Sequence, residues 1–296
     1  MTTRISVPVT TVWSGADAPR TQDAPIVAPE PDPVAWNAAL RDAPPSALHG
    51  RTVTQALLAE PVSVRSERDG WVEVILPWQP SSADPEGYPG WVPAAHVTDA
   101  EEAPYDQQVV VTRPVADSGA TDVSYGTILG AVDADRKSVR VALPDGGIGS
   151  VDADAVAPVT AAHGVPEPAA MLDSARQFVG LRYLWGGTSG WGMDCSGFVH
   201  LVHRRFGVTV PRDAFDQILA TSQSDTAAPG DLYFFTGRDG DRITHVGFVT
   251  NDAGADAAML HAPDGDRLQH IEDGPMSAAR RERLAAAGSF LTRAGH

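Results

Sequence analysis

The stretch 183–198, YLWGGTSGWGMDCSGF, decides the fold of the C-terminal part of this 296-residue chain. At Cys195 a glycine-rich run gives way to an amphipathic pattern that predicts a helix over residues 195–206. The partial positive charge at a helix N-terminus favours a thiolate there, which makes Cys195 a candidate nucleophile. A lone cysteine is more often a buried, inert residue, so the rest of the sequence must decide between the two interpretations.

A thiolate nucleophile needs an imidazole base and a polar group that orients this base. His245 lies at the start of the expected strand 244–250, and His261 lies on the expected strand 257–262. A hairpin of these strands would bring the two imidazoles together. A zinc site formed by the two histidines and Cys195 is an alternative, but the sequence has no second cluster of metal-binding type. Solvated or structural roles are expected for the remaining histidines, which are His49, His96, His163, His200, His203, His270 and His296.

The chain upstream of these residues has the pattern of small all-β units. Short alternating apolar runs separated by Asp, Gly and Pro turns occupy residues 54–97 and again 107–159, which predicts two β modules. Residues 15–35 are dense in Pro, Ala and Asp and are expected to form an irregular surface segment. The glycine-rich run 186–192 has no phosphate-binding motif and is expected to be a flexible loop. Downstream, a helical pattern over 168–180 followed by strands predicts an α+β domain.

Composition excludes several classes of function. The formal net charge of -16 disfavours binding to nucleic acid or to an anionic membrane surface. The single cysteine excludes an internal disulfide and any zinc site that needs two thiolates. No apolar run is long enough for a membrane-spanning helix, and the first residues lack the apolar core of a signal peptide. We therefore expect a cytoplasmic protein, or a secreted one if a leader is missing from the sequence.

Several motifs occur in the order that is typical of one peptidase family. They are Tyr183-Leu184-Trp185-Gly186-Gly187, Asp194-Cys195-Ser196-Gly197-Phe198, Pro211-Arg212-Asp213, Pro229-Gly230-Asp231-Leu232, His245-Val246-Gly247 and His261. Together they resemble the successive motifs of the NlpC/P60 peptidases, over about residues 166–290. The resemblance implies a papain-like α+β fold, no cofactor or metal, and hydrolysis of cell-wall (murein) peptides. It makes Cys195 the nucleophile, His245 the base and His261 its orienting partner, and it places Tyr183 near the oxyanion site.

The upstream modules resemble bacterial SH3 domains. Two such modules before an NlpC/P60 domain resemble the γ-D-glutamyl-L-diamino-acid endopeptidases, which act on released murein peptides. The resemblance implies that Asp194, Ser196 and Asp213 bind the free amine of an N-terminal L-alanine. A tyrosine of the first module, matched to Tyr88, would close the same pocket. Trp185 is a further substrate-binding candidate and Glu60 a weaker one, whereas Ala214 stands where many relatives carry a serine.

The physical chemistry of this amine pocket agrees with the resemblance. Removing an ammonium group from water is costly unless carboxylates and other acceptors replace the water. Asp194, Asp213 and Ser196 together would therefore reject peptides whose N-terminus is acylated. Intact murein offers no such free amine, so released peptides are the expected substrates.

The sequence thus predicts a three-part chain. Residues 1–103 form an N-terminal extension with the first SH3-like barrel, residues 104–162 form the second barrel, and residues 163–296 form the catalytic domain. The predicted reaction is thiol-dependent hydrolysis of the γ-D-glutamyl bond to a diamino acid. Two alternatives are a wall-peptide binding protein with a vestigial peptidase fold and a thiol acyltransferase or amidase on the same fold. Lysine and diaminopimelate both remain open as the diamino acid, and the sequence makes no prediction of the oligomeric state.

Overall fold

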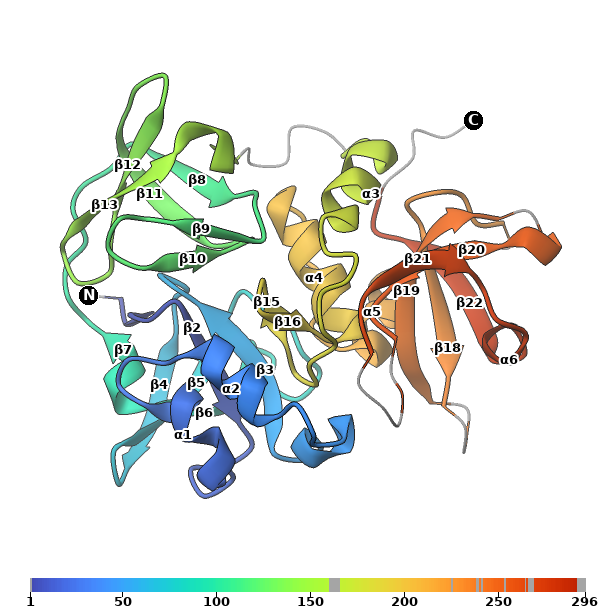
Figure 1. Cartoon of the computed structure of the whole chain (residues 1–296), viewed down its shortest axis with the longest axis horizontal. Helices are drawn as coiled ribbons and strands as arrows, with labels where there is room; N and C mark the ends of the chain where they lie inside the picture. Colours follow the sequence, from blue (N-terminus) through green and yellow to red (C-terminus); the bar gives the residue numbers. More distant parts are fainter. Residues whose placement is uncertain are drawn as a thin grey trace.

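The computed structural model places an all-β region at the N-terminal end of the chain and a mixed helix-and-sheet domain at the C-terminal end (Figure 1). It describes residues 2–159, 166–224, 226–237, 240, 242–252, 254–263, 265 and 269–291. His163 and His296 lie outside these residues. None of the helices in the described ranges is long and apolar enough to cross a membrane.

The first β module is a five-stranded antiparallel sheet with the strand order β3-β2-β6-β5-β4. Its strands are β2 (Val9–Trp13), β3 (Thr52–Leu57), β4 (Ser63–Arg68), β5 (Trp71–Leu76) and β6 (Tyr88–Pro93). A separate pair, β1 (Arg4–Ile5) and β7 (Val97–Thr98), joins the two ends of the module. Apolar residues such as Val12, Val74 and Val92 alternate along the strands and form a core of their own.

The segment 15–35, expected to be an irregular surface segment, is instead partly helical and packed. It contains α1 (Ala24–Val27) and the start of α2 (Pro33–Ala39), and the side chains of Ile26 and Trp36 are fully or almost fully buried. The buried carboxylate of Asp23 accepts a 2.9 Å hydrogen bond from the Trp36 indole and pairs with the Arg51 guanidinium. Most of the segment does lie at the surface, so the prediction was wrong only in expecting no regular or buried part. The segment has few apolar residues to predict its helices, and long-range polar contacts hold it in place.

The second module is also five-stranded, with the order β13-β12-β11-β8-β14. Its strands are β8 (Gln107–Val111), β11 (Ile128–Ala134), β12 (Ser138–Ala142), β13 (Ile148–Asp152) and β14 (Val156–Pro158), with a small hairpin of β9 (Val115–Asp117) and β10 (Asp122–Ser124) beside it. In the strand pairing of the described residues, neither five-stranded sheet is closed by hydrogen bonds between its edge strands. The all-β architecture of the SH3-like prediction is therefore confirmed, but the two sheets are open, whereas closed barrels were predicted.

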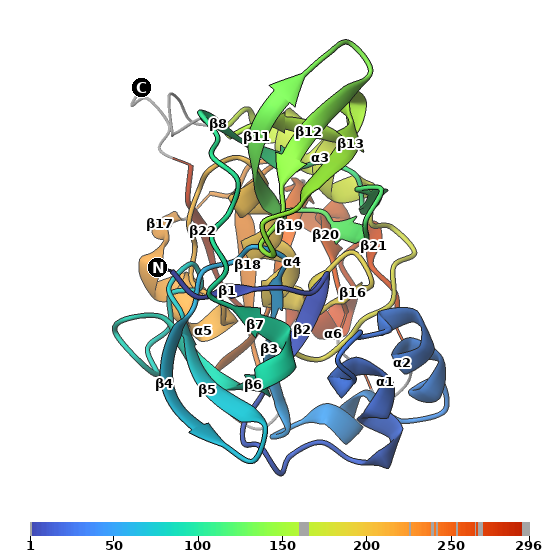
Figure 2. The ribbon, with the colours of Figure 1, turned by 90° about the vertical axis from the view of Figure 1, so that its left-hand side faces the viewer.

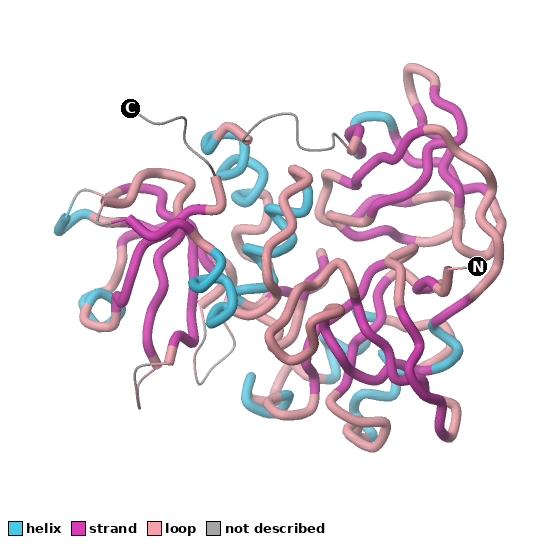
Figure 3. The backbone as a smooth tube through the Cα atoms, turned by 180° about the vertical axis from the view of Figure 1, so that it is seen from behind, coloured by secondary structure: helices cyan, strands magenta, loops and turns pink. Residues whose placement is uncertain are grey.

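The C-terminal domain sets helices against a six-stranded antiparallel sheet of order β17-β22-β18-β19-β20-β21, which confirms the α+β prediction. The helices are α3 (Pro168–Arg176), α4 (Cys195–Arg205), α5 (Ala214–Ala220) and α6 (Ala278–Arg281). The strands are β17 (Ser222–Ser224), β18 (Leu232–Thr236), β19 (Ile243–Asn251), β20 (Ala258–His261), β21 (Glu272–Pro275) and β22 (Leu284–Ser289). Figure 3 shows α3 and α4 between the strands of this domain and those of the β modules.

The glycine-rich run is a buried hairpin rather than the flexible loop expected from sequence. Its strands β15 (Thr188–Ser189) and β16 (Gly192–Met193) lie between the β modules and α4 (Figure 1). Figure 2 shows the second module above the first in the view turned by 90°. The Thr188 amide donates to Gln55 of the first module over 3.0 Å, and the Gly190 amide donates to Ser124 of the second over 2.8 Å. A Cβ at Gly190 would lie only 1.9 Å from the Pro114 carbonyl oxygen. Glycine is therefore needed at this position for close packing against the second module.

Candidate active site

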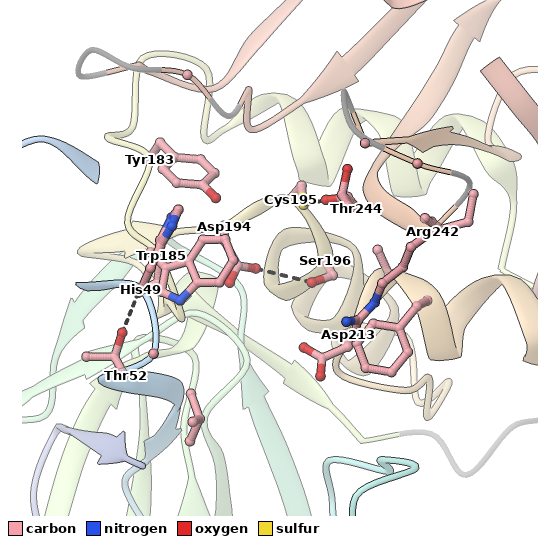
Figure 4. A pocket seen from close by; sticks show the side chains of 18 of the residues that line it. His49, Thr52, Tyr183, Trp185, Asp194, Cys195, Ser196, Asp213, Arg242 and Thr244 are labelled. Carbon is pink, nitrogen blue, oxygen red and sulfur yellow. Dashed lines mark hydrogen bonds between the residues drawn. The ribbon is translucent and has the colours of Figure 1, made fainter. Parts of the chain in front are cut away.

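A cavity of about 810 Å³ lies between the first β module and the C-terminal domain (Figure 4). Thr52, Val53 and Tyr88 of the first module line one wall. The sequence-predicted residues that the structure brings to the same cavity are Tyr88, Tyr183, Trp185, Asp194, Cys195, Ser196 and Asp213. Within the described ranges, no three His, Cys, Asp or Glu side chains are grouped so that they would hold a metal ion.

Cys195 is the first residue of α4, as the sequence predicts. Its N-cap is Asp194, whose Oδ1 accepts a 2.7 Å hydrogen bond from the Gly197 amide and so fixes the first turn. The Cys195 Sγ lies 3.8 Å from the carbonyl oxygen of Thr244, the residue before His245. The thiol is therefore at the helix N-terminus, on the floor of the cavity and beside the strand of the expected base.

The two histidines meet across the β19–β20 hairpin, which confirms their predicted proximity. His245 Nε2 and His261 Nδ1 are 2.9 Å apart, and His261 Nε2 lies 3.3 Å from a carboxylate oxygen of Glu272 on β21. The pKa of His245 lies well below its usual range. Burial is the main cause, and the charges of Arg280, His261 and Arg283 lower the pKa further. The lowered pKa favours the neutral imidazole, which is the form that can accept a proton.

Aromatic side chains form the wall of the cavity opposite α5. Figure 4 shows the Tyr183 hydroxyl directed into the cavity. The ring of Trp185 contacts that of His49, with the ring centroids 3.9 Å apart. The backbone carbonyl oxygen of Trp185 accepts a 3.1 Å hydrogen bond from the Thr52 hydroxyl. His49 lies in a loop without any motif, so sequence reasoning gave it no part in the site.

The Asp194 carboxylate is bound to neighbouring protein groups on both oxygens. Its Oδ2 accepts a hydrogen bond from Arg212 Nη2 over 2.7 Å and from the Gly186 amide over 2.9 Å. Arg212 Nη1 donates to Asp194 Oδ1 and to the Ser196 hydroxyl, each over 3.0 Å, and its Nε donates to Thr54 of the first module over 2.8 Å. The fully buried Arg212 thus neutralises Asp194 and ties the first module to the helix of Cys195.

Asp213 and Tyr88 form the acidic end of the cavity. The Tyr88 hydroxyl donates a 2.9 Å hydrogen bond to Asp213 Oδ2, which joins the first module to the residue before α5. The Asp213 side chain makes no capping hydrogen bond to that helix. Burial raises the pKa of Asp213, although Arg212 and Tyr88 act in the opposite direction. Asp213 therefore has fewer contacts that neutralise its charge than Asp194 has.

The structure corrects the interpretation of Glu60, which does not line the described cavity. Its carboxylate is fully buried, pairs with Arg204 over 2.8 Å and accepts a 3.0 Å hydrogen bond from Gln79. A buried carboxylate needs such partners to offset its desolvation, and Arg204 on α4 provides the charge. Glu60 is thus part of the contact between the first module and α4.

A thiol at a helix N-terminus, beside a strand of an antiparallel sheet that carries a buried imidazole, is the arrangement of a papain-like cysteine peptidase. The NlpC/P60 family profile matches residues 180–282. The chain is 31% identical to a γ-D-glutamyl-L-lysine dipeptidyl-peptidase of Bacillus cereus, over 90% of this chain and 84% of that protein. It is 33% identical to the protein of the same name from Bacillus subtilis, over 86% of this chain and 88% of that protein.

The fold agrees with these similarities. A crystal structure of an NlpC/P60 family protein from Bacillus cereus superposes with a TM-score of 0.85 at 28% identity, covering 99% of this chain and 100% of that one. The chain therefore belongs to the NlpC/P60 family, and it is a peptidase.

Proposed function

We propose that this peptidase hydrolyses the γ-D-glutamyl bond to a diamino acid in murein peptides that carry a free N-terminal L-alanine. The observation that carries the proposal is the contact between Tyr88 and Asp213, which puts a carboxylate and a hydroxyl of two domains at one end of the cavity of Cys195. The names of the two Bacillus relatives support the same bond type. A requirement for released peptides suits recycling of murein peptides in the cytoplasm.

In the proposed mechanism, the Cys195 thiol gives its proton to His245 as the sulfur attacks the γ-carbonyl carbon of D-glutamate. The protonated His245 then passes this proton to the amine of the departing diamino acid, which leaves the glutamyl group as a thioester on Cys195. Water then attacks the thioester with His245 as the base, which releases the L-Ala-γ-D-Glu product and regenerates the thiol. Backbone N–H groups at the start of α4 and the Tyr183 hydroxyl stabilise the negative charge on the carbonyl oxygen in both steps.

Asp213 is the main acidic group for the substrate ammonium in this proposal. Asp194 keeps a smaller electrostatic part because Arg212 already pairs with it. The Ser196 hydroxyl accepts a hydrogen bond from Arg212 and donates one to Asp194, and these two contacts fix its oxygen beside Asp194. Trp185 packs against the peptide, and Tyr88 closes the space behind the amine.

The test of the proposed function is product analysis on a panel of synthetic muropeptides. Mass spectrometry should find L-Ala-γ-D-Glu and a free diamino acid, or the peptide that begins with it, as the products of wild-type enzyme. Cleavage at another bond, or no cleavage of any murein peptide, would contradict the proposal. Transfer of the acyl group to an added amine in place of hydrolysis would favour the acyltransferase alternative.

The two histidines should contribute unequally. His245→Ala removes the base of both chemical steps, whereas His261→Ala removes only the group that holds the imidazole through the 2.9 Å contact. We expect kcat of the His261 variant to fall about 10- to 100-fold and that of the His245 variant to fall much further. Steady-state kinetics of both variants on one peptide measures the difference. A silent His261→Ala would remove this residue from the site, and equal losses would contradict the assigned order.

A further inference from the structure

The connection between β2 and β3 is much longer than these strands need. They are neighbouring antiparallel strands, which a loop of about two to five residues can join. Residues 14–51 join them instead, and this segment contains α2. It reaches the hairpin of β15 and β16, where the Asn37 side chain donates a 2.7 Å hydrogen bond to the carbonyl oxygen of Trp191. The segment 14–51 therefore connects the first module to the catalytic domain.

Arg182 makes a second contact between the catalytic domain and this segment. Its Nη1 donates a 2.6 Å hydrogen bond to the carbonyl oxygen of Asn37, and its Nη2 donates a 2.9 Å hydrogen bond to that of Leu40. Both carbonyl groups lie at the C-terminal end of α2, where they carry partial negative charge. Among the residues that the structure describes, the Arg182 guanidinium has no carboxylate partner. The end of α2 thus takes the place of a counter-ion for this partly buried cation.

Arg182 directly precedes Tyr183, whose hydroxyl is directed into the cavity of Cys195 (Figure 4). Both residues have strand-like pairing, Arg182 with His270 and Tyr183 with Met193. Consecutive side chains of such extended backbone point to opposite sides. The Arg182 side chain therefore extends to α2 while Tyr183 points into the cavity. Anchoring Arg182 fixes the rotation of this short stretch about its own axis, and with it the direction of the Tyr183 side chain.

The segment that holds Arg182 is itself firmly held. The Arg51 guanidinium donates 2.9 Å hydrogen bonds to the carbonyl oxygens of Ala18 and Ala47, and it pairs with the buried Asp23 carboxylate. Apolar residues of the segment surround a narrow gap beside residues 182–185; they are Leu40, Ala43, Pro44 and Leu48. The end of α2 is therefore a fixed support behind Tyr183 and Trp185.

We propose that Arg182 is a positioning residue, whose contact with the end of α2 keeps the Tyr183 hydroxyl directed at the oxyanion of the reaction. The inference rests on the role of Tyr183 in the proposed function and adds the segment 14–51 to the groups that set the rate. A donor stabilises an oxyanion best when it is held in place before the reaction. A displacement of about 1 Å can lower a rate by up to about 100-fold. Loss of the Arg182 contact should therefore lower kcat and leave KM almost unchanged.

The test is a double-mutant cycle on kcat with one peptide that wild-type enzyme cleaves. Tyr183→Phe removes the hydroxyl and should lower kcat about 100-fold. Arg182→Gln should lower kcat about 10-fold and change KM by less than about twofold. Adding Arg182→Gln to Tyr183→Phe should cause no further loss, because no hydroxyl remains to be positioned. Arg182→Lys keeps the charge and a donor at the end of α2, so it should retain part of the activity that Arg182→Gln loses.

Asn37→Ala is the matched control, because it removes the other hydrogen bond from α2 to the catalytic domain, which leads to Trp191 and not to Tyr183. It should lower the thermal unfolding midpoint to an extent similar to Arg182→Gln and change kcat by less than about twofold. Alkylation of Cys195 by iodoacetamide forms no oxyanion. Its rate should therefore be the same in wild type and in both single variants.

Three results would overturn the inference. They are an unchanged kcat in Arg182→Gln, a loss that multiplies fully with that of Tyr183→Phe, and an equal loss in Asn37→Ala. If Arg182→Gln does not fold, the same cycle with Arg182→Lys decides the question. An unchanged kcat in Tyr183→Phe would refute the oxyanion role and this inference together, whereas the proposed function is decided separately by the bond that wild type cleaves.

Discussion

Cys195→Ala should abolish hydrolysis of L-Ala-γ-D-Glu peptides, with kcat/KM lower than that of wild type by at least about four orders of magnitude. The expected loss is large because the thiolate forms the acyl intermediate, and no other cysteine is present in the chain. The side chain is small and almost buried, so the fold should survive its truncation. Steady-state kinetics and the thermal unfolding midpoint of the same preparations measure the two effects.

Two controls separate the nucleophile from its alternatives. Iodoacetamide should inactivate wild-type enzyme and leave Cys195→Ala unlabelled, because the chain has a single thiol. Activity that is lost on treatment with EDTA would favour the zinc alternative. A contaminant-free, folded Cys195→Ala protein that cleaves at a rate comparable to wild type would show that another group is the nucleophile.

The parts of the fold that depend on local sequence could be predicted. The helix of Cys195 follows from the change from a glycine-rich run to helical periodicity, and its first residue was placed correctly. The meeting of His245 and His261 follows from two apolar strands joined by a turn, which form neighbouring strands of one sheet. These features depend on patterns within a few residues and on one short connection.

The parts that depend on contacts between distant residues could not be predicted. The packing of Trp36 is set by the buried Asp23 carboxylate, and the pattern of residues 15–35 carries no sign of that contact. Glu60 is held by Arg204, 144 residues away in the sequence. A carboxylate looks the same in a sequence whether it faces a ligand or an arginine. Only the three-dimensional structure shows that Glu60 has such a partner.

Asp194 illustrates the same limit inside the site. The sequence places it correctly beside the nucleophile, and the resemblance gives it a role in amine binding. The structure adds that Arg212 donates to both of its oxygens. A charge-paired carboxylate attracts a substrate ammonium less than an unpaired one does. The amine site therefore depends more on Asp213 than the sequence indicated, and this difference leads to a prediction for Asp213.

Acetylation of the substrate amine should remove most of the activity. The peptide L-Ala-γ-D-Glu-diaminopimelate and its N-acetyl form differ only in that group, so their kcat/KM ratio measures recognition of the amine. The acetyl group removes the positive charge that faces Asp213, and it adds atoms where Tyr88 closes the cavity. We expect at least a 100-fold preference of wild-type enzyme for the free peptide, because charge and space act together.

Asp213→Asn should lower kcat/KM for the free peptide about 30- to 150-fold, since a charge-assisted contact in a desolvated site is worth about 2 to 3 kcal/mol. For the N-acetyl peptide, the same substitution should lower kcat/KM much less. Tyr88→Phe keeps the ring and removes only the hydroxyl, so it should lower kcat/KM for either peptide less than Asp213→Asn does for the free peptide.

Because burial raises the pKa of Asp213, its carboxylate gains a proton earlier than an exposed one as the pH falls. The preference for the free amine should therefore decline toward acidic pH in wild type and stay flat in Asp213→Asn. Comparable cleavage of the free and acetylated peptides by wild type at neutral pH would contradict the amine pocket and indicate a hydrolase that also accepts intact wall.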